Sequence, residues 1–230
     1  MTHPSSEAQD EMEPAPGRLG RDRPSRIPIT IATIGLALIA GVVGATITSP
    51  DRPGDVSAEA GFSRDMAVHH AQAVDMAVVT RDNTGDREVR TLALDIVLTQ
   101  QNQIGRMQDW LIQWRLPLIG ERPAMAWMND MPGHGPARTM SASRPGGPMP
   151  GMATTAELQR LRAARGKAAE VLFLTLMIRH HRGGVVMAGA VLQRTERGDV
   201  RDLARSMVTG QQAEIGVMQK MLKDRGAPPA

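Results

Sequence analysis

Two pairs of histidines, each flanked by methionines, are the residues of this sequence best suited to chemistry. The pairs are His69-His70 and His180-His181, and together they contain four of the six histidines in the chain. Imidazole suits copper, zinc and nickel, and thioether sulfur prefers Cu(I), so this combination predicts a soft-metal site that needs no thiolate. The predicted ligands are Met66, His69, His70, Met76, Met177, His180, His181 and Met187.

A structural role is the alternative for the same residues. A histidine pair on an apolar helix face can be buried with its ring nitrogens bonded to backbone or glutamine. Methionine commonly fills gaps in helical cores. Spacing alone leaves both interpretations open.

The two pairs belong to an internal repeat whose copies lie 111 residues apart, as His69 and His180 show. Phe62 and Phe173 keep the same offset, and the register continues without a gap into the following helix of each copy. A repeat of this length is too long for a solenoid unit. It therefore predicts a helical half-domain that has been duplicated and joined by a linker.

Four helices are expected to position these side chains. Apolar residues recur at steps of three and four, which is the period of an amphipathic helix, so each histidine pair falls on one stripe with its methionines. Since no alternating β pattern appears, we expect an all-α protein in which two helical hairpins pack as a four-helix bundle. The predicted helices cover residues 57–81, 86–114, 155–197 and 200–225.

Local signals mark the ends of these helices. In the turn between the first two helices, Gly85 is the predicted C-cap of the first helix and Asp86 the predicted N-cap of the second. Thr154 with Glu157 fits a capping box before the third helix. Gly183-Gly184 lies just after the second histidine pair. Two glycines there lower helix propensity, and they predict close packing or a local kink.

The chain outside the bundle divides by composition. Residues 1–26 are polar and predict a disordered cytoplasmic tail. Residues 27–48 carry no charge and are about long enough to cross a bilayer, and the arginines before them place the N-terminus in the cytoplasm. We expect a transmembrane anchor there, with a cleaved signal segment as the alternative. The remaining ranges are a spacer at 49–56 and a bundle at 57–225, made of repeats 57–115 and 154–225 with a linker at 116–153.

The linker is rich in Gly, Pro and Met and shows no strong periodicity. Met125, Met128, Met131 and His134 follow one another at intervals of three residues. Such a segment has little core for methionine to fill, and flexible Met/His tracts can capture Cu(I). We therefore add these four residues to the predicted metal ligands. The alternative is hydrophobic docking of the linker on the bundle, with Trp127 as the anchor.

Composition argues against several other classes of protein. The chain has no Cys, which excludes disulfides and thiolate metal sites. Its net charge is only +3 and its aromatic content 2%, whereas nucleic-acid binding needs a basic stripe with stacking aromatics. No Glu-x-x-His of a di-iron bundle occurs, nor a phosphate loop or nucleophile elbow. We therefore expect no enzyme, with a copper oxidase as the alternative, because no sequence signal distinguishes one from a copper binder.

The pattern Phe-x3-Met-x2-His-His-x5-Met, followed on the next helix by Gln-x2-Glu-Ile-x2-Met, resembles the domain of unknown function 305 family over about residues 57–225. The resemblance implies a ferritin-like four-helix bundle, exported or membrane-anchored, in a family that includes copper-binding and copper-resistance proteins. It also implies metal ligation by the eight His and Met residues of the two helical stripes. One position departs from the pattern, because Gln103 stands where the second copy has Glu214.

The sequence thus predicts a membrane-tethered, extracytoplasmic protein that binds copper, preferably Cu(I), for copper tolerance or trafficking. A cleaved N-terminal segment would make the protein secreted. The expected partners are the metal ion and the membrane, with a homo-oligomer as a further possibility and no nucleic acid. The alternative function is a metal-free helical scaffold or interaction domain.

Overall fold

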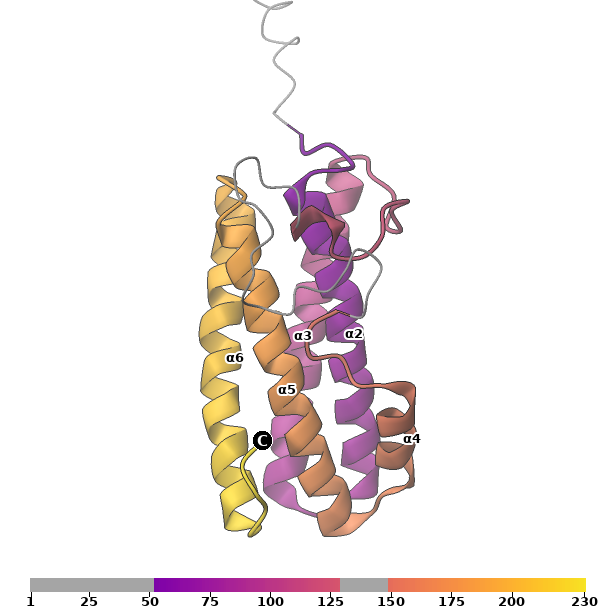
Figure 1. Cartoon of the computed structure of the whole chain (residues 1–230), viewed down its shortest axis with the longest axis vertical. Coiled ribbons are helices and arrows are strands. Elements are labelled where there is room, and N and C mark those ends of the chain that lie inside the picture. The colour runs from indigo at the N-terminus through magenta and orange to yellow at the C-terminus, as the bar shows by residue number, and fades with distance from the viewer. Residues whose placement is uncertain (1–51, 129–148) are drawn as a thin grey trace, which may run out of the picture. The chain divides into compact units, whose positions relative to one another are not determined.

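The computed structural model describes residues 52–128 and 149–230, and this part of the chain contains helices and no strand. Four long helices make up most of it, together with a short helix and one 3-10 turn (Figure 1). The all-α prediction is therefore confirmed. The elements are α2 Ala58–Asn83, α3 Arg87–Gln113, η1 Ala126–Met128, α4 Thr155–Ala163, α5 Gly166–Leu192 and α6 Gly198–Asp224.

The long helices pack as two hairpins. Helix α2 packs along α3 and α5 packs along α6, while contact between α2 and α5 joins the two hairpins. The short helix α4 packs against α2 and lies on the outside of the bundle (Figure 1). The interface between α2 and α5 brings together the two helices that carry the histidine pairs.

The buried core forms two clusters, one toward each end of the α2–α5 interface. One cluster contains Met76 and Met177, and the other contains Met66 and Met187. The first methionine of each repeat copy therefore meets the second methionine of the other copy. This exchange is what a twofold relation between antiparallel helices produces, and it leaves the histidines between the two clusters.

The predicted third helix is in fact two helices. The expected range 155–197 is divided by Ala164 and Arg165, which have extended backbones, and by Gly166, which has a φ of +50°. Glycine adopts this left-handed conformation at little cost. Before the break, Leu161 is buried in the core cluster of Met76, which fixes α4 as a separate element on α2. The second of the two helices ends at Leu192, earlier than predicted.

The capping predictions were mostly confirmed. The side chain of Asp86 accepts a hydrogen bond from the Val89 amide at 2.9 Å, and Thr154 and Glu157 form the capping box. The predicted C-cap at Gly85 is wrong, because α2 ends at Asn83 and its C-cap is Thr84, which has an extended backbone. The hydroxyl of Thr84 donates to the carboxylate of Glu170 on α5, so a tertiary contact ends this helix.

Several predictions fall on residues that the structure does not describe. The predicted cytoplasmic tail at 1–26 and the predicted membrane segment at 27–48 lie outside the described residues, as do Met131 and His134. Within residues 52–128 and 149–230, no helix combines the length and the apolar character needed to cross a membrane.

Candidate metal centre

The first histidine of each pair meets its counterpart where α2 passes α5. The ring centroids of His69 and His180 are 3.8 Å apart, with an angle of 32° between the ring planes. The His180 Nε2 atom donates to the backbone carbonyl of His69 at 3.0 Å. All four histidines of the two pairs are buried. The structure thus brings the two repeat copies together at their histidines.

The second histidine of each pair is bonded to the neighbouring helix of its own hairpin. The His70 Nε2 atom lies 2.7 Å from the side-chain oxygen of Gln103 on α3. The His181 Nε2 atom lies 2.6 Å from the carboxylate of Glu214 on α6. Both partners are 33 residues beyond their histidine, so the two contacts are equivalent in the repeat. One partner is a neutral amide and the other is a carboxylate.

The end of the linker covers this cluster. We call residues 149–153 the linker strap. The His69 Nε2 atom donates to the carbonyl oxygen of Pro150 in the strap at 3.0 Å. A Cβ at Gly183 would lie 2.0 Å from the same oxygen, so a helical glycine is required for the strap to approach α5. This confirms the close packing predicted for the glycine pair.

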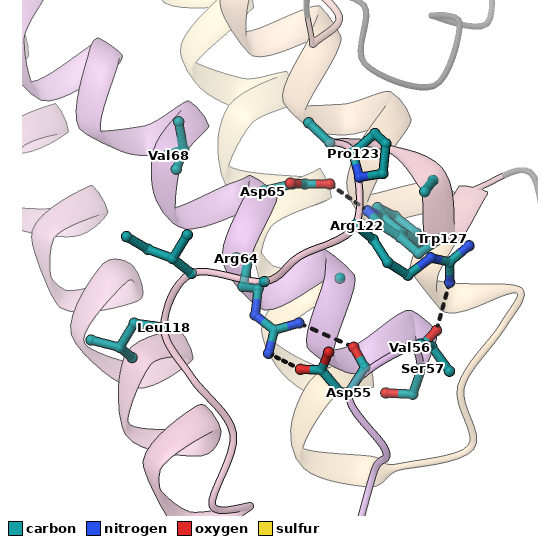
Figure 2. A pocket seen from close by; sticks show the side chains of 15 residues that line it. Asp55, Val56, Ser57, Arg64, Asp65, Val68, Leu118, Arg122, Pro123 and Trp127 are labelled. Carbon is teal, nitrogen blue, oxygen red and sulfur yellow. Dashed lines mark hydrogen bonds and ion pairs between the residues drawn. The ribbon is translucent and has the colours of Figure 1, made fainter.

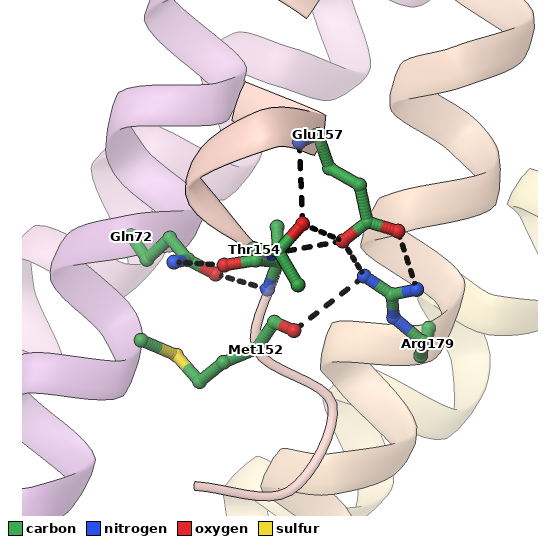
Figure 3. Close-up of polar contacts among 6 residues, drawn as sticks. Gln72, Met152, Thr154, Glu157 and Arg179 are labelled. Atoms are coloured by element: carbon green, nitrogen blue, oxygen red, sulfur yellow. Dashed lines mark hydrogen bonds and ion pairs between the residues drawn. The ribbon is translucent and has the colours of Figure 1, made fainter. Parts of the chain in front are cut away.

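Polar contacts clamp the linker strap on both sides (Figure 3). From α2, Gln72 bonds both the amide and the carbonyl of Ala153, at 2.6 Å and 3.0 Å. On the other side, Arg179 of α5 bonds the carboxylate of Glu157 at 2.5 Å and reaches the carbonyl of Met152. The strap is therefore held between the two helices that carry the histidines.

Three imidazole nitrogens in the cluster are buried without a hydrogen-bond partner. They are the Nδ1 atoms of His69, His70 and His181. A neutral imidazole that donates from Nε2 carries a lone pair on Nδ1. Metal-bound histidine shows the same arrangement, in which one nitrogen binds the metal and the other donates to a carbonyl or carboxylate. Each of these Nδ1 atoms therefore has the hydrogen-bonding state of a metal-ligating imidazole.

Burial keeps the imidazole rings of His69, His70 and His180 neutral. Desolvation is the main cause that lowers the pKa of His69 to about 4 and the pKa of His70 to about 3, from an ordinary value of 6.5. Desolvation also lowers the pKa of His180 well below that value, and the other histidines of the cluster add to the effect. Since a metal binds the neutral imidazole, these rings need not lose a proton at neutral pH before they can act as ligands.

The thioethers lie on either side of the imidazoles. Met66, Met76, Met177 and Met187 are all fully buried, and they divide between the two core clusters as pairs. Among the described residues, no group of three or more His, Cys, Asp or Glu side chains is arranged to hold a metal ion.

The described part of the linker is docked on the bundle through Trp127. The Trp127 ring packs edge-on against Phe62 at 5.9 Å, and its Nε1 atom donates to the carboxylate of Asp65 at 2.9 Å (Figure 2). Asp65 also accepts a bond from the Met125 amide. Burial raises the pKa of Asp65, while these bonds act in the opposite direction. The Trp127 anchor that the sequence offered as an alternative is thus present.

Because the linker is docked on the bundle, its first two methionines, Met125 and Met128, contact the core. Met125 is buried in the cluster of Met66, and Met128 packs against that cluster while partly exposed. Both side chains therefore have a core to fill. A cavity of about 190 Å³ lies beside this contact and is lined in part by Arg64 and Leu118 (Figure 2). Metal ligation by Met125 and Met128 stays a prediction.

Backbone and glutamine acceptors, which the structural alternative predicted, are present at Pro150, His69 and Gln103. Sequence reasoning did not assign Gln103 and Glu214 to their particular histidines. The 33-residue spacing in both copies could have identified Gln103 and Glu214 as partners of the second histidines. The carbonyl of Pro150 had no such signal, because a backbone acceptor in a linker without periodicity leaves no pattern in the sequence.

The family model for the domain of unknown function DUF305 matches residues 59–222. Solved structures with the same fold include a DUF305 protein from Streptomyces coelicolor, with 46% identity, a TM-score of 0.68 and coverage of 77% of this chain and 99% of that chain. A DUF305 fragment from Deinococcus radiodurans has 34% identity, a TM-score of 0.59 and coverage of 76% and 99%. CopM in a Cu(II)-bound form has 27% identity, a TM-score of 0.53 and coverage of 73% and 97%. The search of curated proteins found no match.

Proposed function

The chain belongs to the DUF305 family, the domain of unknown function 305, and on that premise we propose that it binds copper where α2 passes α5. The observation that carries the proposal is the set of buried, unpaired Nδ1 atoms of His69, His70 and His181. A buried polar atom without a partner costs about 1–3 kcal/mol. Bound metal would supply the missing partner and offset this cost.

The donor types favour copper, and Cu(I) in particular. Thioether sulfur is a soft ligand that suits Cu(I), and imidazole suits copper in either oxidation state. The described stripes provide both donors and no thiolate. The likeness to CopM, which has been solved with bound Cu(II), supports a metal of this kind. We propose that the imidazoles hold the ion and that the methionine pairs on either side supply thioether sulfur.

We further propose that the protein acts outside the cytoplasm, in copper tolerance or trafficking. The uncharged segment at 27–48 supports export, with the chain either tethered or released after cleavage. The relative from Streptomyces coelicolor is assigned as a secreted protein, which supports the same location. The domain limits 57–225 and the ferritin-like arrangement are part of this proposal, and the family match over residues 59–222 supports them.

A titration with Cu(I) tests the proposal on the full chain. Wild-type protein should bind Cu(I) saturably, and its melting temperature should rise, because a ligand that binds only the native state stabilises it. A variant with all four paired histidines replaced by alanine should bind no copper at this site. The Leu222→Ala variant is the control, since it removes a fully buried side chain that has no donor atom.

The metal-free scaffold is the competing function, and the same titration separates the two. A scaffold would show the same melting temperature with and without copper. Equal copper binding by the wild type and the folded four-histidine variant would place the metal elsewhere and contradict the proposed site.

A further inference from the structure

The two halves of the histidine cluster differ in charge although they match in geometry. His70 and His181 both direct Nε2 at a side-chain oxygen on the next helix, at 2.7 Å and 2.6 Å. The oxygen belongs to an amide at Gln103 and to a carboxylate at Glu214. Because a duplication starts from identical halves, the difference arose after the duplication.

Glu214 is the one charged group among the four acceptors that hold the Nε2 atoms of the histidines. His69 and His180 donate to the backbone carbonyls of Pro150 and His69. The charge of Arg179, next to His180 in sequence, is directed to Glu157 in an ion pair. The side chain of Glu214 is 25% exposed, whereas that of His181 is fully buried. The carboxylate therefore keeps some hydration while its charge acts on the buried ring.

A buried cation is costly unless an opposite charge compensates it. Neutral imidazoles and thioethers supply no such charge. One carboxylate compensates a single positive charge, and it also makes the histidine that it holds a stronger donor to a metal. A divalent ion in the same place would leave one positive charge uncompensated.

We propose that Glu214 is the residue that determines cation charge at this site, by matching the cluster to one monovalent soft cation bound first at His181. The inference rests on the proposed function and deepens it, because it assigns the two halves unequal affinity. His70, held by the neutral Gln103, is the weaker half. Glu214 acts through His181 and is a positioning residue.

The repeat supplies a matched set of variants for the test. Glu214→Gln puts in the second half the amide that the first half already uses, so the hydrogen bond to His181 can persist. Gln103→Glu places a second carboxylate, and the double exchange moves the single charge from one half to the other. Circular dichroism and thermal unfolding of the full-length variants check that each one folds.

Competition titrations with Cu(I) and with Zn(II) measure the effect. Glu214→Gln should lower the affinity for Cu(I) about 10- to 100-fold, which is typical for loss of a partner behind a metal-bound histidine. Gln103→Glu should raise the affinity for Zn(II) by about 10-fold. The double exchange should restore Cu(I) affinity to near the wild-type value.

A spectroscopic measurement on the unmutated protein locates the first ion. Ag(I) is a soft, diamagnetic cation of the same charge, and substoichiometric Ag(I) should shift the ¹⁵N resonance of His181 Nδ1 before that of His70. In the double exchange the order should reverse. A structural role for Glu214 would not move this order.

The outcomes separate the two proposals. If the wild type binds no Cu(I), both the proposed function and this inference are overturned. If the wild type binds Cu(I) and Glu214→Gln binds it within about twofold of the wild type, only the role of Glu214 is overturned. The role is also overturned if His70 shifts first in the wild type.

Discussion

At the scale of single residues, the notable feature is that four buried histidines lie together with few of their Nδ1 atoms satisfied. Three of those atoms lack a partner, and each such buried atom reduces stability by about 1–3 kcal/mol. Apolar residues of similar size would avoid this cost. The unpaired atoms therefore make the protein less stable than its packing would allow, and the proposed metal ion would supply their missing partner.

The histidines predict that the metal-free protein loses stability as the pH falls below 6.5. In the unfolded chain these rings take up protons near their ordinary pKa of 6.5. In the folded state the pKa of His69 is about 4 and the pKa of His70 is about 3. Between the folded and unfolded pKa values the unfolded state binds more protons. Each ring therefore lowers the free energy of unfolding by about 1.4 kcal/mol for every unit by which the pH falls. Urea unfolding with a chelator present, at pH 7, 6 and 5, measures the loss.

Two acidic groups with shifted pKa values, Glu157 and Asp65, also affect how stability depends on pH. The pKa of Glu157 is lowered from its ordinary value of 4.5 to about 2, chiefly by Arg179. The stability that this shift contributes is lost only as the pH falls below 4.5, which is outside the range from pH 7 to pH 5. The raised pKa of Asp65 acts in the opposite direction and adds stability as the pH falls. Equal stability at pH 7 and pH 5 would contradict the burial of neutral histidines.

A second prediction at this scale concerns the linker anchor. Asp65→Ala removes the acceptor of two bonds, from the Met125 amide and the Trp127 indole. Leaving buried donors unpaired should lower the free energy of unfolding by about 1–3 kcal/mol. Urea unfolding followed by tryptophan fluorescence measures the change. The control is Asp109→Ala, because Asp109 is exposed; a loss of similar size in both variants would refute the anchor.

At the scale of elements, the strap and the helix beneath it depend on one glycine. Gly183→Ala would place a Cβ against the backbone of Pro150, which cannot give way as a flexible side chain can. The strap must shift, and the bond from His69 Nε2 to Pro150 must lengthen. We expect a loss of about 1–3 kcal/mol in the free energy of unfolding, the usual range for overpacking.

Gly189 on the same helix is the matched control, because a Cβ there would meet nothing within 4 Å. Gly189→Ala should stabilise α5 slightly, by up to about 1 kcal/mol. Urea unfolding gives the stability of both variants, and hydrogen exchange at residues 151–153 reports the strap. If both variants behave alike, the strap does not depend on close packing at Gly183.

The elements also show which features the sequence could predict. The caps at Asp86 and Thr154 were found because they depend on residues within one turn of the chain. The break between α4 and α5 was missed because Ala164 and Arg165 are compatible with a helix, and packing of Leu161 in the core fixes α4 separately. The C-cap of α2 was misjudged for a similar reason, since the hydroxyl of the true C-cap, Thr84, bonds Glu170 across the bundle.

The same distinction applies to the site. The meeting of His69 and His180 followed from the duplication, because equivalent stripes of two related helices face each other across a twofold axis. The division of the methionines into two clusters followed from the antiparallel crossing of α2 and α5, which spacing along one helix does not reveal. Residue identity thus indicated which side chains could act as donors, and topology decided how those side chains are distributed.

At the scale of the whole molecule, the twofold relation implies that each hairpin carries a surface made for its counterpart. Helix α5 buries His180, Met177 and Met187 against α2. A fragment of residues 154–230 would expose this face, and the same face of a second copy is its nearest substitute for α2. We expect the fragment to form a dimer in which the two copies of His180 meet.

Size-exclusion chromatography with light scattering measures the mass of this fragment. The His180→Asp variant should disrupt the dimer, since it places two like charges where the two copies of residue 180 would meet. The wild-type fragment should have twice the monomer mass, and the variant should be monomeric or unfolded. Because the dimer would carry two copies of Glu214 and none of Gln103, it should also bind divalent ions better than the full chain does. A folded, monomeric wild-type fragment would contradict this account, because it would mean that α5 does not need a matching face to be stable.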